Sequence, residues 1–492
     1  MELWDIFDRV RQPLNRTAVR GSIISKTDFH LIIHAWVRRK SDGRLLVSKR
    51  VPEIFWGSYW QPTGGSVKAG EAGKDAALRE LREELGIKAD DAQSTLLFSY
   101  RFVPPEPENP SFFLDCWLFE FDDVSQKLEI IPVLQKEEVA DARWCTFQEI
   151  IDLWKTGSFM PFETTWQPYF QVLQKCLQKP GSIFSLRAWG AAELKTTKTT
   201  TPELDSSLLL SHVLGCSKDE LLVRASDKVS AEDTLNFAKL LYRRADGMPV
   251  AYLTGRKDFW KSSFEVSPAV LIPKPDTELL VELAAKLVEA RAHALSARPQ
   301  NALPHGAQPK TLSIADVCTG SGCIGISVFQ EALDLHINPA DMKFVLSDIS
   351  KDALAIAQKN ARAILGENAQ NISFVQGDLL EPFLAGAENP QHFDIILSNP
   401  PYVPAAVTDE LLLDGRNEPR LALDGGSDGL DIIRRLIPQV WQALNKNGIL
   451  LIETGEYNAA QTAELLKDSG FIEIATFNDL GGQPRVTQAK KP

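Results

Sequence analysis

Leu312-Ser-Ile-Ala-Asp-Val317 runs directly into Cys318-Thr319-Gly320-Ser321-Gly322 and then into Ile324-Gly-Ile-Ser-Val-Phe329. The first stretch has the apolar composition typical of a buried strand, and the last stretch is typical of a helix. The glycines between them let the main chain turn sharply and approach a bound molecule closely. A strand, a glycine-rich turn and a helix in this order predict an α/β domain with a ligand at the turn.

Two later apolar runs end in acids. Lys343 to Ser347 precedes Asp348, a carboxylate suited to the hydroxyl pair of a ribose. Ile372 to Gly377 precedes Asp378 and Leu379, an acidic and an apolar group able to frame an adenine. A lone acid at a strand end is usually a turn former, but the ordered set favours a nucleoside-containing cofactor. No P-loop lysine follows the glycines, which argues against a triphosphate site.

Asn399-Pro400-Pro401-Tyr402 closes the next apolar run, Phe393 to Ser398. A planar NH2 group is a poor nucleophile, because its lone pair is delocalised. The Asn399 side-chain oxygen and the Pro400 carbonyl, held at a strand end, would accept both N–H hydrogens as the nitrogen attacks a methyl donor. Proline fixes φ and has no N–H, and Tyr402 would cover a flat group. The alternative interpretation is an ordinary strand-ending turn.

This ordered set resembles the class I S-adenosylmethionine-dependent methyltransferases that methylate amide or amino nitrogens. The resemblance implies a Rossmann-like sheet. It also implies that S-adenosylmethionine contacts Cys318, Thr319, Gly320, Ser321, Gly322, Asp348, Asp378, Leu379 and Asn399. The substrate would be held by Asn399, Pro400, Pro401 and Tyr402, with Asn399 and Pro400 as the catalytic pair.

Residues 183–492 resemble, along their whole length, the release-factor glutamine methyltransferases of the HemK or PrmC type. Besides Asn399 to Tyr402, the resemblance rests on Pro249 to Gly255, Leu271-Ile-Pro-Lys-Pro-Asp-Thr-Glu278, Glu418-Pro419 and Ala422 to Leu430. It implies peptide chain release factors as protein partners, methylated on the glutamine amide of their Gly-Gly-Gln loop, and a helical module that helps to hold them. Three residues depart from the family pattern: Cys318 replaces glycine, Lys274 replaces arginine and Leu379 replaces an aromatic.

A different motif lies in the first third of the chain. Gly65, Glu71, Arg79 to Glu84 and Gly86-Ile87 fit G-x5-E-x7-R-E-U-x-E-E-x-G-U, where U is a bulky aliphatic residue. Residues 73–85 predict a helix on which Glu80, Glu83 and Glu84 recur at three- and four-residue steps. Clustered carboxylates repel unless a hard cation such as Mg²⁺ or Mn²⁺ neutralises them. That metal would screen a diphosphate and activate water, although a charged helix face alone is more often a solvent face.

The motif is the Nudix box, and residues 1 to about 165 resemble a Nudix hydrolase domain, an α/β/α sandwich. Strands are expected at His30 to Arg38, Arg44 to Ser48 and Ser111 to Phe121. The flanking sequence is most similar to the branch related to isopentenyl diphosphate isomerases. No cysteine lies between Trp56 and Gly65, where that isomerase carries one. The resemblance therefore favours hydrolysis of a nucleoside-diphosphate-type compound, with Glu80, Glu83 and Glu84 as metal ligands and Glu83 as the catalytic residue. His30 and His34 are expected to be structural.

The chain divides by sequence pattern into five parts. These are a Nudix domain at 1–165, a linker at 166–182, a helical substrate-binding module at 183–250, a β-hairpin connector at 251–275 and a methyltransferase domain at 276–492. Lys179-Pro-Gly-Ser182 breaks the periodic pattern. Thr201-Pro202 predicts a helix start, followed by an apolar stripe of Leu204, Leu208, Leu209 and Val213. Ala292 to Pro309 has the composition of a flexible surface insertion.

Composition narrows the class of protein. The 492 residues are 44% hydrophobic and 24% charged, which is typical of globular domains. No apolar run is long enough to cross a bilayer, and the N-terminus lacks a signal-peptide pattern. Six scattered cysteines are expected to be reduced in a cytoplasmic protein. A formal net charge of −12 argues against stable nucleic-acid binding.

Two alternatives stay open at this point. Exocyclic-amine methyltransferases of DNA or RNA share the Asn/Asp-Pro-Pro-Tyr/Phe motif, and the Nudix domain could be a binding module with an idle box.

Overall fold

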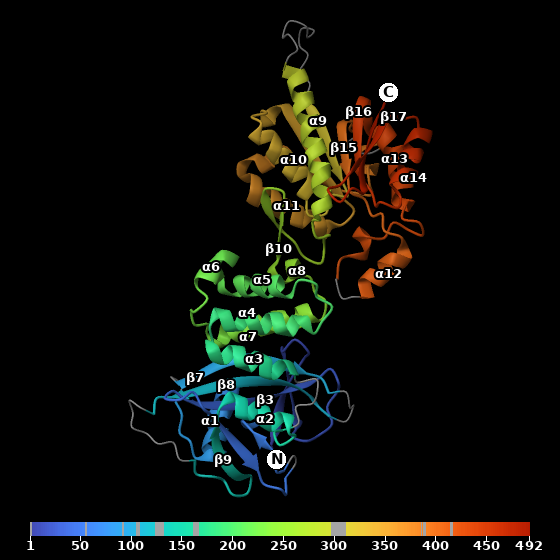
Figure 1. The fold of residues 1–492 in the computed structure, drawn as a ribbon. Helices are drawn as coiled ribbons and strands as arrows, with labels where there is room; N and C mark the ends of the chain where they lie inside the picture. Colours follow the sequence, from blue (N-terminus) through green and yellow to red (C-terminus); the bar gives the residue numbers. More distant parts are fainter. Residues whose placement is uncertain are drawn as a thin grey trace. The chain divides into compact units, whose positions relative to one another are not determined.

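The computed structural model describes residues 2–54, 57–90, 93–104, 109–123, 132–160, 167–296, 311–384, 386, 390–413 and 417–492. The chain folds into two compact units, Met1–Leu253 and Thr254–Pro492 (Figure 1). No helix of the described residues combines the length and the apolar character that a membrane crossing requires.

The first unit is built on a mixed sheet. Its nine strands in the described residues are β1 (Leu3–Phe7), β2 (Pro13–Val19), β3 (Phe29–Arg39), β4 (Leu45–Arg50), β5 (Trp60–Gln61), β6 (Thr63–Ser66), β7 (Ser94–Phe102), β8 (Ser111–Phe121) and β9 (Val139–Cys145). Strand β3 pairs with β8 in parallel and with β4 and β6 in antiparallel fashion. The strands expected around His30, Arg44 and Ser111 are thereby confirmed.

Helices cover both faces of this sheet. Helix α1 (Gly73–Leu85) has the bounds predicted from the sequence and ends at Gly86, whose φ of 66° needs glycine. A Cβ at Gly73 would meet Leu31 and Ile33 of β3, whereas Tyr169 of α3 contacts His34 and Trp36. Because side chains alternate along a strand, α1 and α3 lie on opposite faces. The expected α/β/α sandwich is confirmed. Helix α2 (Phe147–Lys155) completes this part and begins with a capping box of Thr146 and Glu149.

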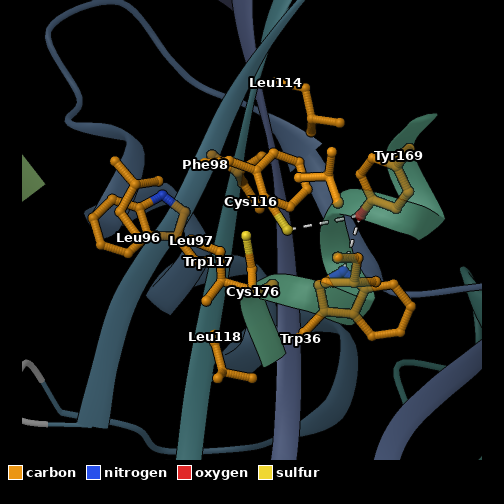
Figure 2. Close-up of a cluster of buried hydrophobic side chains, with 14 of the residues drawn as sticks. Trp36, Leu96, Leu97, Phe98, Leu114, Cys116, Trp117, Leu118, Tyr169 and Cys176 are labelled. Carbon is orange, nitrogen blue, oxygen red and sulfur yellow. Dashed lines mark hydrogen bonds between the residues drawn. The ribbon is translucent and has the colours of Figure 1, made fainter. Parts of the chain in front are cut away.

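The segment 166–182 differs from the expected linker. Gln167–Gln178 form helix α3, and Tyr169, Leu173 and Cys176 of this helix are buried in the core of the unit. Figure 2 shows the Tyr169 hydroxyl within this core, where it accepts a hydrogen bond from Trp36 Nε1 at 2.9 Å and lies 3.7 Å from Cys116 Sγ. Only the turn around Lys179 to Ser182 interrupts the helices, where the sequence predicted a break.

A helical module follows. Its helices are α4 (Ile183–Lys195), α5 (Pro202–Leu214), α6 (Lys218–Val223), α7 (Ala231–Ala245) and α8 (Val250–Thr254). Pro202 begins α5 as predicted, but Thr201 makes no capping hydrogen bond to the backbone. The predicted stripe of α5 is correct in part. Leu209 is buried and Leu208 and Val213 are half-buried, but Leu204 is 45% exposed. Ser206 and Leu210, which lie outside the predicted stripe, are buried. The small Ser206 lies against Gly190 of α4, where a Cβ would come within 2.4 Å of its Oγ. Close packing of α4 and α5 therefore selects the small-residue face.

The helical module and the Nudix sheet share one hydrophobic core. Helix α7 packs on β7, and the ring of its Tyr242 lies 5.2 Å from that of Phe113 in β8. The Tyr242 hydroxyl donates to Ser99 Oγ at 2.9 Å, and Arg11 donates to the same oxygen at 2.6 Å. Arg11 also forms a buried, two-pronged ion pair with Asp115, at 2.5 and 2.7 Å. The module thus belongs to the same compact body as the Nudix domain.

The second unit begins with a hairpin of β10 (Arg256–Phe259) and β11 (Ser262–Glu265), as predicted. Its main sheet has seven strands among the described residues, in the order β14-β13-β12-β15-β16-β18-β17. Their bounds are β12 (Leu312–Val317), β13 (Met342–Asp348), β14 (Ile372–Gln376), β15 (Phe393–Ser398), β16 (Leu444–Glu453), β17 (Ile472–Asn478) and β18 (Pro484–Lys490). The first five in this order are parallel, and β18 is antiparallel to both neighbours. This arrangement confirms the Rossmann-like sheet.

Helices lie on both faces of this sheet as well. They are α9 (Glu278–Ser296), α10 (Cys323–Asp334), α11 (Lys351–Leu365), α12 (Ala405–Leu413), α13 (Asp431–Ala443) and α14 (Ala459–Asp468), with 3-10 turns η3 (Pro275–Thr277), η5 (Pro339–Asp341), η6 (Gly366–Asn371), η7 (Glu381–Phe383) and η8 (Arg420–Ala422). Ile314 of β12 belongs to the core that contains α9 and α10, while its neighbour Ala315 belongs to the core that contains α13. This alternation buries β12 on both sides. Of the predicted insertion, 292–296 is the end of α9, and 297–309 lies outside the described residues.

Candidate active sites

A cavity of about 670 Å³ lies in the second unit at the carboxyl ends of the parallel strands. The strands β14, β13, β12 and β15 are neighbours in this order, so the residues that follow them meet at one edge. Among the predicted site residues, the cavity is lined by Cys318, Thr319, Gly320, Ser321, Asp348, Asp378, Leu379, Asn399 and Pro401. The sequence motifs therefore come together as expected, although they are spread over more than eighty positions.

The glycine-rich turn follows β12 in a left-handed conformation. Cys318, Gly320 and Gly322 have φ values of 61°, 56° and 81°. A Cβ at Gly320 would meet no other heavy atom within 4 Å, so the chain presents bare backbone to the cavity. A Cβ at Gly322 would approach Ile326 Cδ1 to 2.7 Å, so glycine is needed there for packing of α10. Positive φ at Cys318 explains why a glycine is favoured at this position.

Asp316 of β12 holds the turn by hydrogen bonds, and it lies outside the sequence motifs. Its Oδ2 accepts hydrogen bonds from Thr319 Oγ1 at 2.6 Å and from the Gly325 amide at 3.0 Å. The side chain is fully buried, and its Oδ1 has no hydrogen-bond partner among the described residues. Burial raises the pKa of Asp316 to about 7. An acid within an otherwise apolar strand was the available signal.

Asp348 ends β13 beside the turn. Its Oδ2 accepts from the Gly320 amide at 2.9 Å, and its Oδ1 accepts from the Ser350 amide at 2.9 Å. Burial raises the pKa of Asp348, and the two backbone donors oppose that shift. A carboxylate has more acceptor positions than these two bonds use. The group is therefore suited to receive further donors from the cavity.

The loop after β14 places Asp378 and Leu379 at the cavity. Asp378 forms an ion pair with Arg435 of α13, and both residues line the cavity. Leu379 is buried with a φ of 54°, a left-handed conformation that is unusual for leucine. The backbone N–H of the next residue, Leu380, donates to Gln439 Oε1 at 2.8 Å and so helps to fix the loop.

Asn399 follows β15, and its side-chain nitrogen donates to Thr277 Oγ1 at 3.3 Å. The amide oxygen is consequently turned away from Thr277. Asn399 and Pro401 line the cavity. Pro400, between them in the sequence, is buried and is not among the described residues that line the cavity. One member of the predicted acceptor pair is therefore an asparagine whose side chain is oriented by the Thr277 hydroxyl, which lies outside the motif.

Tyr402 lies elsewhere than expected. Its hydroxyl donates to Glu453 Oε1 at 3.1 Å, and it is not among the described residues that line the cavity. Its carbonyl accepts from Asn458 Nδ2 at 3.0 Å and from the Tyr457 hydroxyl at 3.2 Å. A half-buried tyrosine usually finds a partner for its hydroxyl, and Glu453 provides it. The expectation that this ring covers a flat substrate has no support from this arrangement.

Glu453, at the end of β16, is a second acid that lies outside the sequence motifs. It is 1% exposed, and its Oε2 has no hydrogen-bond partner among the described residues. Burial raises the pKa of Glu453 to about 7. Interactions with Thr277 and Tyr402 and the nearby charge of Arg485 oppose that rise. A glutamate that ends the apolar run from Ile449 to Ile452 was the signal.

Two other family segments meet beside the cavity. Lys274 donates to Glu418 Oε1 at 2.6 Å, and Glu418 is 6% exposed. Lys274, Pro419 and Arg420 also line the cavity. Since one ammonium group makes this contact, the planar fork of an arginine is not required for it.

The Nudix box lies on α1 in the first unit. Arg79 donates to Glu71 at 2.9 Å, to Glu80 at 2.6 Å and to Glu83 at 3.2 Å. A Cβ at Gly65 would come within 2.1 Å of Glu80 Oε1, so glycine is required where β6 passes the helix. The motif residues are therefore brought together as the spacing predicted.

The three predicted metal ligands have different surroundings. Glu84 is 2% exposed, its Oε2 has no hydrogen-bond partner among the described residues, and burial raises its pKa to about 8. Burial also raises the pKa of Glu80, whereas the Glu83 side chain is half exposed. Within the described ranges, no three His, Cys, Asp or Glu side chains form a ready cation-binding group. The buried free oxygen of Glu84, within the electrostatic reach of Glu80, nevertheless fits a cation held by these two carboxylates.

The two histidines of β3 lie in the core. His34 Nδ1 is 2.9 Å from the Tyr169 hydroxyl, and His30 stacks on Trp4 with ring centroids 4.0 Å apart. Burial lowers the pKa of His30 to about 4 and that of His34 to about 3. Both residues are therefore neutral parts of the core at pH 7, which confirms their structural role.

Comparison with protein families gives separate matches for the Nudix domain, the helical module and the methyltransferase domain. The PrmC N-terminal domain matches residues 185–255, the NUDIX domain matches residues 28–161 and a methyltransferase domain matches residues 309–484. The Nudix box falls within the NUDIX match, and the strand ends that line the cavity fall within the methyltransferase match.

Several curated proteins are similar to the chain. The release factor glutamine methyltransferase of Koribacter versatilis is 34% identical over 300 residues, which cover 61% of this chain and 95% of that protein. That of Bradyrhizobium diazoefficiens is 36% identical over 312 residues, covering 63% of this chain and 95% of that protein. A solved methyltransferase from Pyrococcus furiosus is 14% identical, with a TM-score of 0.29 over 46% of this chain and 88% of that chain. The sequence relatives, rather than the solved structure, carry the similarity.

Proposed function

Because this chain belongs to the release factor glutamine methyltransferase family, with a NUDIX domain in the same polypeptide, we propose that it methylates the glutamine of the Gly-Gly-Gln loop in peptide chain release factors. The methyl group goes to the side-chain amide nitrogen. The helical module, residues 183–250, helps to hold the release factor. The hairpin and methyltransferase limits at 251–275 and 276–492 remain part of this proposal, with the linker confined to the turn around Lys179 to Ser182.

S-adenosylmethionine is the proposed cofactor, and it supplies an electrophilic methyl group on a sulfonium. The cavity fits such a molecule: it offers bare backbone at Gly320, free acceptor capacity at Asp348 and an apolar wall at Leu379. Cys318, Thr319, Ser321 and Gly322 would shape the turn that holds it, and Asp378 would face its adenine. The volume of about 670 Å³ leaves room for cofactor and amide together.

Asn399 and Pro400 carry the proposed chemistry. Their oxygen atoms would accept the two N–H hydrogens of the glutamine amide and return electron density to its nitrogen. The nitrogen loses a proton after attack, so no strong base is needed. Much of the rate then comes from holding the nitrogen in line with the methyl group. Pro401 and Tyr402 are proposed to complete the amide-holding turn.

One observation supports this proposal above the others. The side-chain nitrogen of Asn399 is committed to Thr277, at 3.3 Å, in a residue that lines the cavity. The remaining amide oxygen is therefore available as an acceptor on the cavity side. An acceptor at this strand end is what a glutamine amide requires.

The test offers labelled S-adenosylmethionine to the full chain with either a purified release factor or DNA and RNA oligonucleotides. Transfer to the release factor alone supports the proposal. Transfer to oligonucleotides alone would establish the exocyclic-amine alternative instead.

For the Nudix site, the proposal is Mg²⁺- or Mn²⁺-dependent hydrolysis of a nucleoside-diphosphate-type compound. Glu80 and Glu84 would hold the cation, with Glu83 as a further ligand or as the residue that activates water. The buried free oxygen of Glu84 supports this function. Hydrolysis of a nucleotide panel by the wild type and by Glu83→Gln tests it. Turnover that requires Mg²⁺ and is lost in the variant is expected, and absence of turnover on every diphosphate would favour a binding module.

A further inference from the structure

Behind Asn399 lies a group of buried polar side chains outside the Asn-Pro-Pro-Tyr motif. Thr277 is 2% exposed at the end of η3, and Glu453 is 1% exposed at the end of β16. Tyr402 donates to Glu453 at 3.1 Å, and Asn399 donates to Thr277 at 3.3 Å. Thr277 also lies close enough to the Glu453 carboxyl to lower its pKa. Two hydrogen-bonded pairs from three separate segments therefore lie next to one another, with the Thr277 hydroxyl beside the Glu453 carboxyl.

The direction of each hydrogen bond follows from the chemistry of the groups. The NH2 of Asn399 can only donate, so Thr277 Oγ1 accepts there. The single Thr277 proton is then free for the Glu453 carboxyl. Tyr402 directs its proton to the same carboxyl. An ionised carboxylate only accepts, and it therefore sets the direction of the whole chain.

Reversal of this direction would turn the asparagine over. If the residue at 453 donated a proton to Thr277, the Thr277 proton would point toward Asn399. The amide would then present its oxygen to Thr277 and its NH2 to the cavity. Two donors would face the hydrogens of the substrate amide, and the acceptor pair would be lost.

We propose that Thr277 and Glu453 are positioning residues that lock the Asn399 amide with its oxygen toward the cavity. The inference deepens the proposed function and rests on it for the identity of the substrate amide. Glu453 does not reach the substrate, because it is buried behind Tyr402 and Thr277. Its Oε2 has no hydrogen-bond partner among the described residues, so the carboxyl keeps acceptor capacity beyond the bond from Tyr402.

Matched substitutions at Thr277 test the lock in the full chain. Thr277→Val keeps the shape and removes the hydroxyl, whereas Thr277→Ser keeps the hydroxyl. Thr277→Val is expected to lower kcat for release-factor methylation by about 10- to 100-fold, with the Kd for S-adenosylmethionine unchanged. Thr277→Ser should retain most of the activity. Equal kcat values for Thr277→Val and the wild type would overturn the proposal.

Substitution at Glu453 tests the direction of the chain. Glu453→Gln keeps the shape but introduces a donor beside Thr277. It should lower kcat as Thr277→Val does, again with the Kd for S-adenosylmethionine unchanged. Full activity of Glu453→Gln would show that direction is irrelevant and would reject the role of Glu453.

A second readout does not depend on the protein substrate. With ¹⁵N-asparagine labelling, the Asn399 NH2 signal, assigned with Asn399→Ala, should be protected from exchange in the wild type and in Thr277→Ser. Protection should be lost in Thr277→Val. Equal protection in all three proteins would contradict the lock, even if the wild type methylates release factor. Conversely, a protected Asn399 in a wild type that methylates no release factor would reject the proposed function and retain the lock.

Discussion

The Asn399 side-chain nitrogen and the Thr277 hydroxyl oxygen lie 3.3 Å apart, although 122 positions separate them in the chain. Thr277 belongs to the short η3 turn before α9, and Asn399 follows β15. Since an amide carries a donor on one side and an acceptor on the other, this contact decides which atom faces the cavity. The oxygen is turned away from Thr277, and in the proposed function it accepts from an incoming NH2 group.

The left-handed conformation of Cys318 predicts an unusual order of stabilities. A φ of 61° is strained for any residue with a Cβ. Both substitutions remove the thiol, but Cys318→Gly relieves this strain, whereas Cys318→Ala keeps it. The glycine variant should therefore be more stable than the alanine variant by about 1 kcal/mol. Denaturant unfolding of both variants measures the difference, and a more stable alanine variant would contradict the strain.

The ionisation of Glu453 predicts a pH dependence of methyl transfer. Burial raises its pKa to about 7, so the carboxylate that accepts from Tyr402 and faces Thr277 forms as pH rises through that value. Below it, the protonated group must donate and disturbs the chain of hydrogen bonds. The other ionisable groups that face it are Arg485, Asp276, Tyr402 and Cys323.

We therefore expect kcat to rise between about pH 6 and pH 8 in the wild type. The same profile measured with Glu453→Gln should be low and nearly flat. An unchanged rise in this variant would assign the titration to another group.

Glu84 predicts how the Nudix site binds metal. Its pKa is raised to about 8 by burial, and only the ionised form binds a cation well. Mg²⁺ or Mn²⁺ affinity should therefore fall by up to about tenfold per pH unit below pH 8. Calorimetric titrations from pH 6.5 to pH 8.5 measure this slope.

Two variants serve that titration. Glu84→Gln should bind the metal weakly at every pH. Asp75→Asn, which removes an exposed charge from the same helix, is the control and should keep the slope. A pH-independent affinity in the wild type would show that Glu84 is not a ligand.

The buried ion pair of Arg11 and Asp115 predicts one cooperative unit. Removing Arg11 leaves a buried carboxylate without its partner, which costs about 3–5 kcal/mol. Because the Tyr242 hydroxyl shares Ser99 with Arg11, Arg11→Ala should destabilise the Nudix sheet and the helical module together. Hydrogen exchange of both parts checks this, with Arg224→Ala at an exposed ion pair as control. Destabilisation confined to the sheet would contradict a shared core.

Much of the second unit could be predicted because its signals are local. A strand, the turn from Cys318 to Gly322, and strand ends at Asp348, Asp378 and Asn399 each occupy a few consecutive residues. Parallel strands then bring their carboxyl ends to one edge without further information. The helix that carries Glu80, Glu83 and Glu84 was predicted with the correct bounds for the same reason.

The supporting residues depend on tertiary contacts and were not predicted. Asp316 and Glu453 lie within or at the end of apolar strands, and only the neighbouring segments show what their carboxyls bind. The residues of helix α3 were expected to form a linker. Their burial depends on contact with the Nudix sheet, which the local sequence does not show. The stripe of α5 was misplaced in part because Ser206 packs closely on Gly190, a contact that hydrophobicity does not register.

Mass analysis of the Gly-Gly-Gln peptide from a release factor, incubated with S-adenosylmethionine and the full chain, is the most direct test of the central claim. The expected result is a single added methyl group on the glutamine side chain with the wild type. With Asn399→Ala, which should still bind S-adenosylmethionine, none is expected. An unmodified peptide with the wild type, or equal methylation by Asn399→Ala, would contradict an amide-holding role for the Asn399 oxygen.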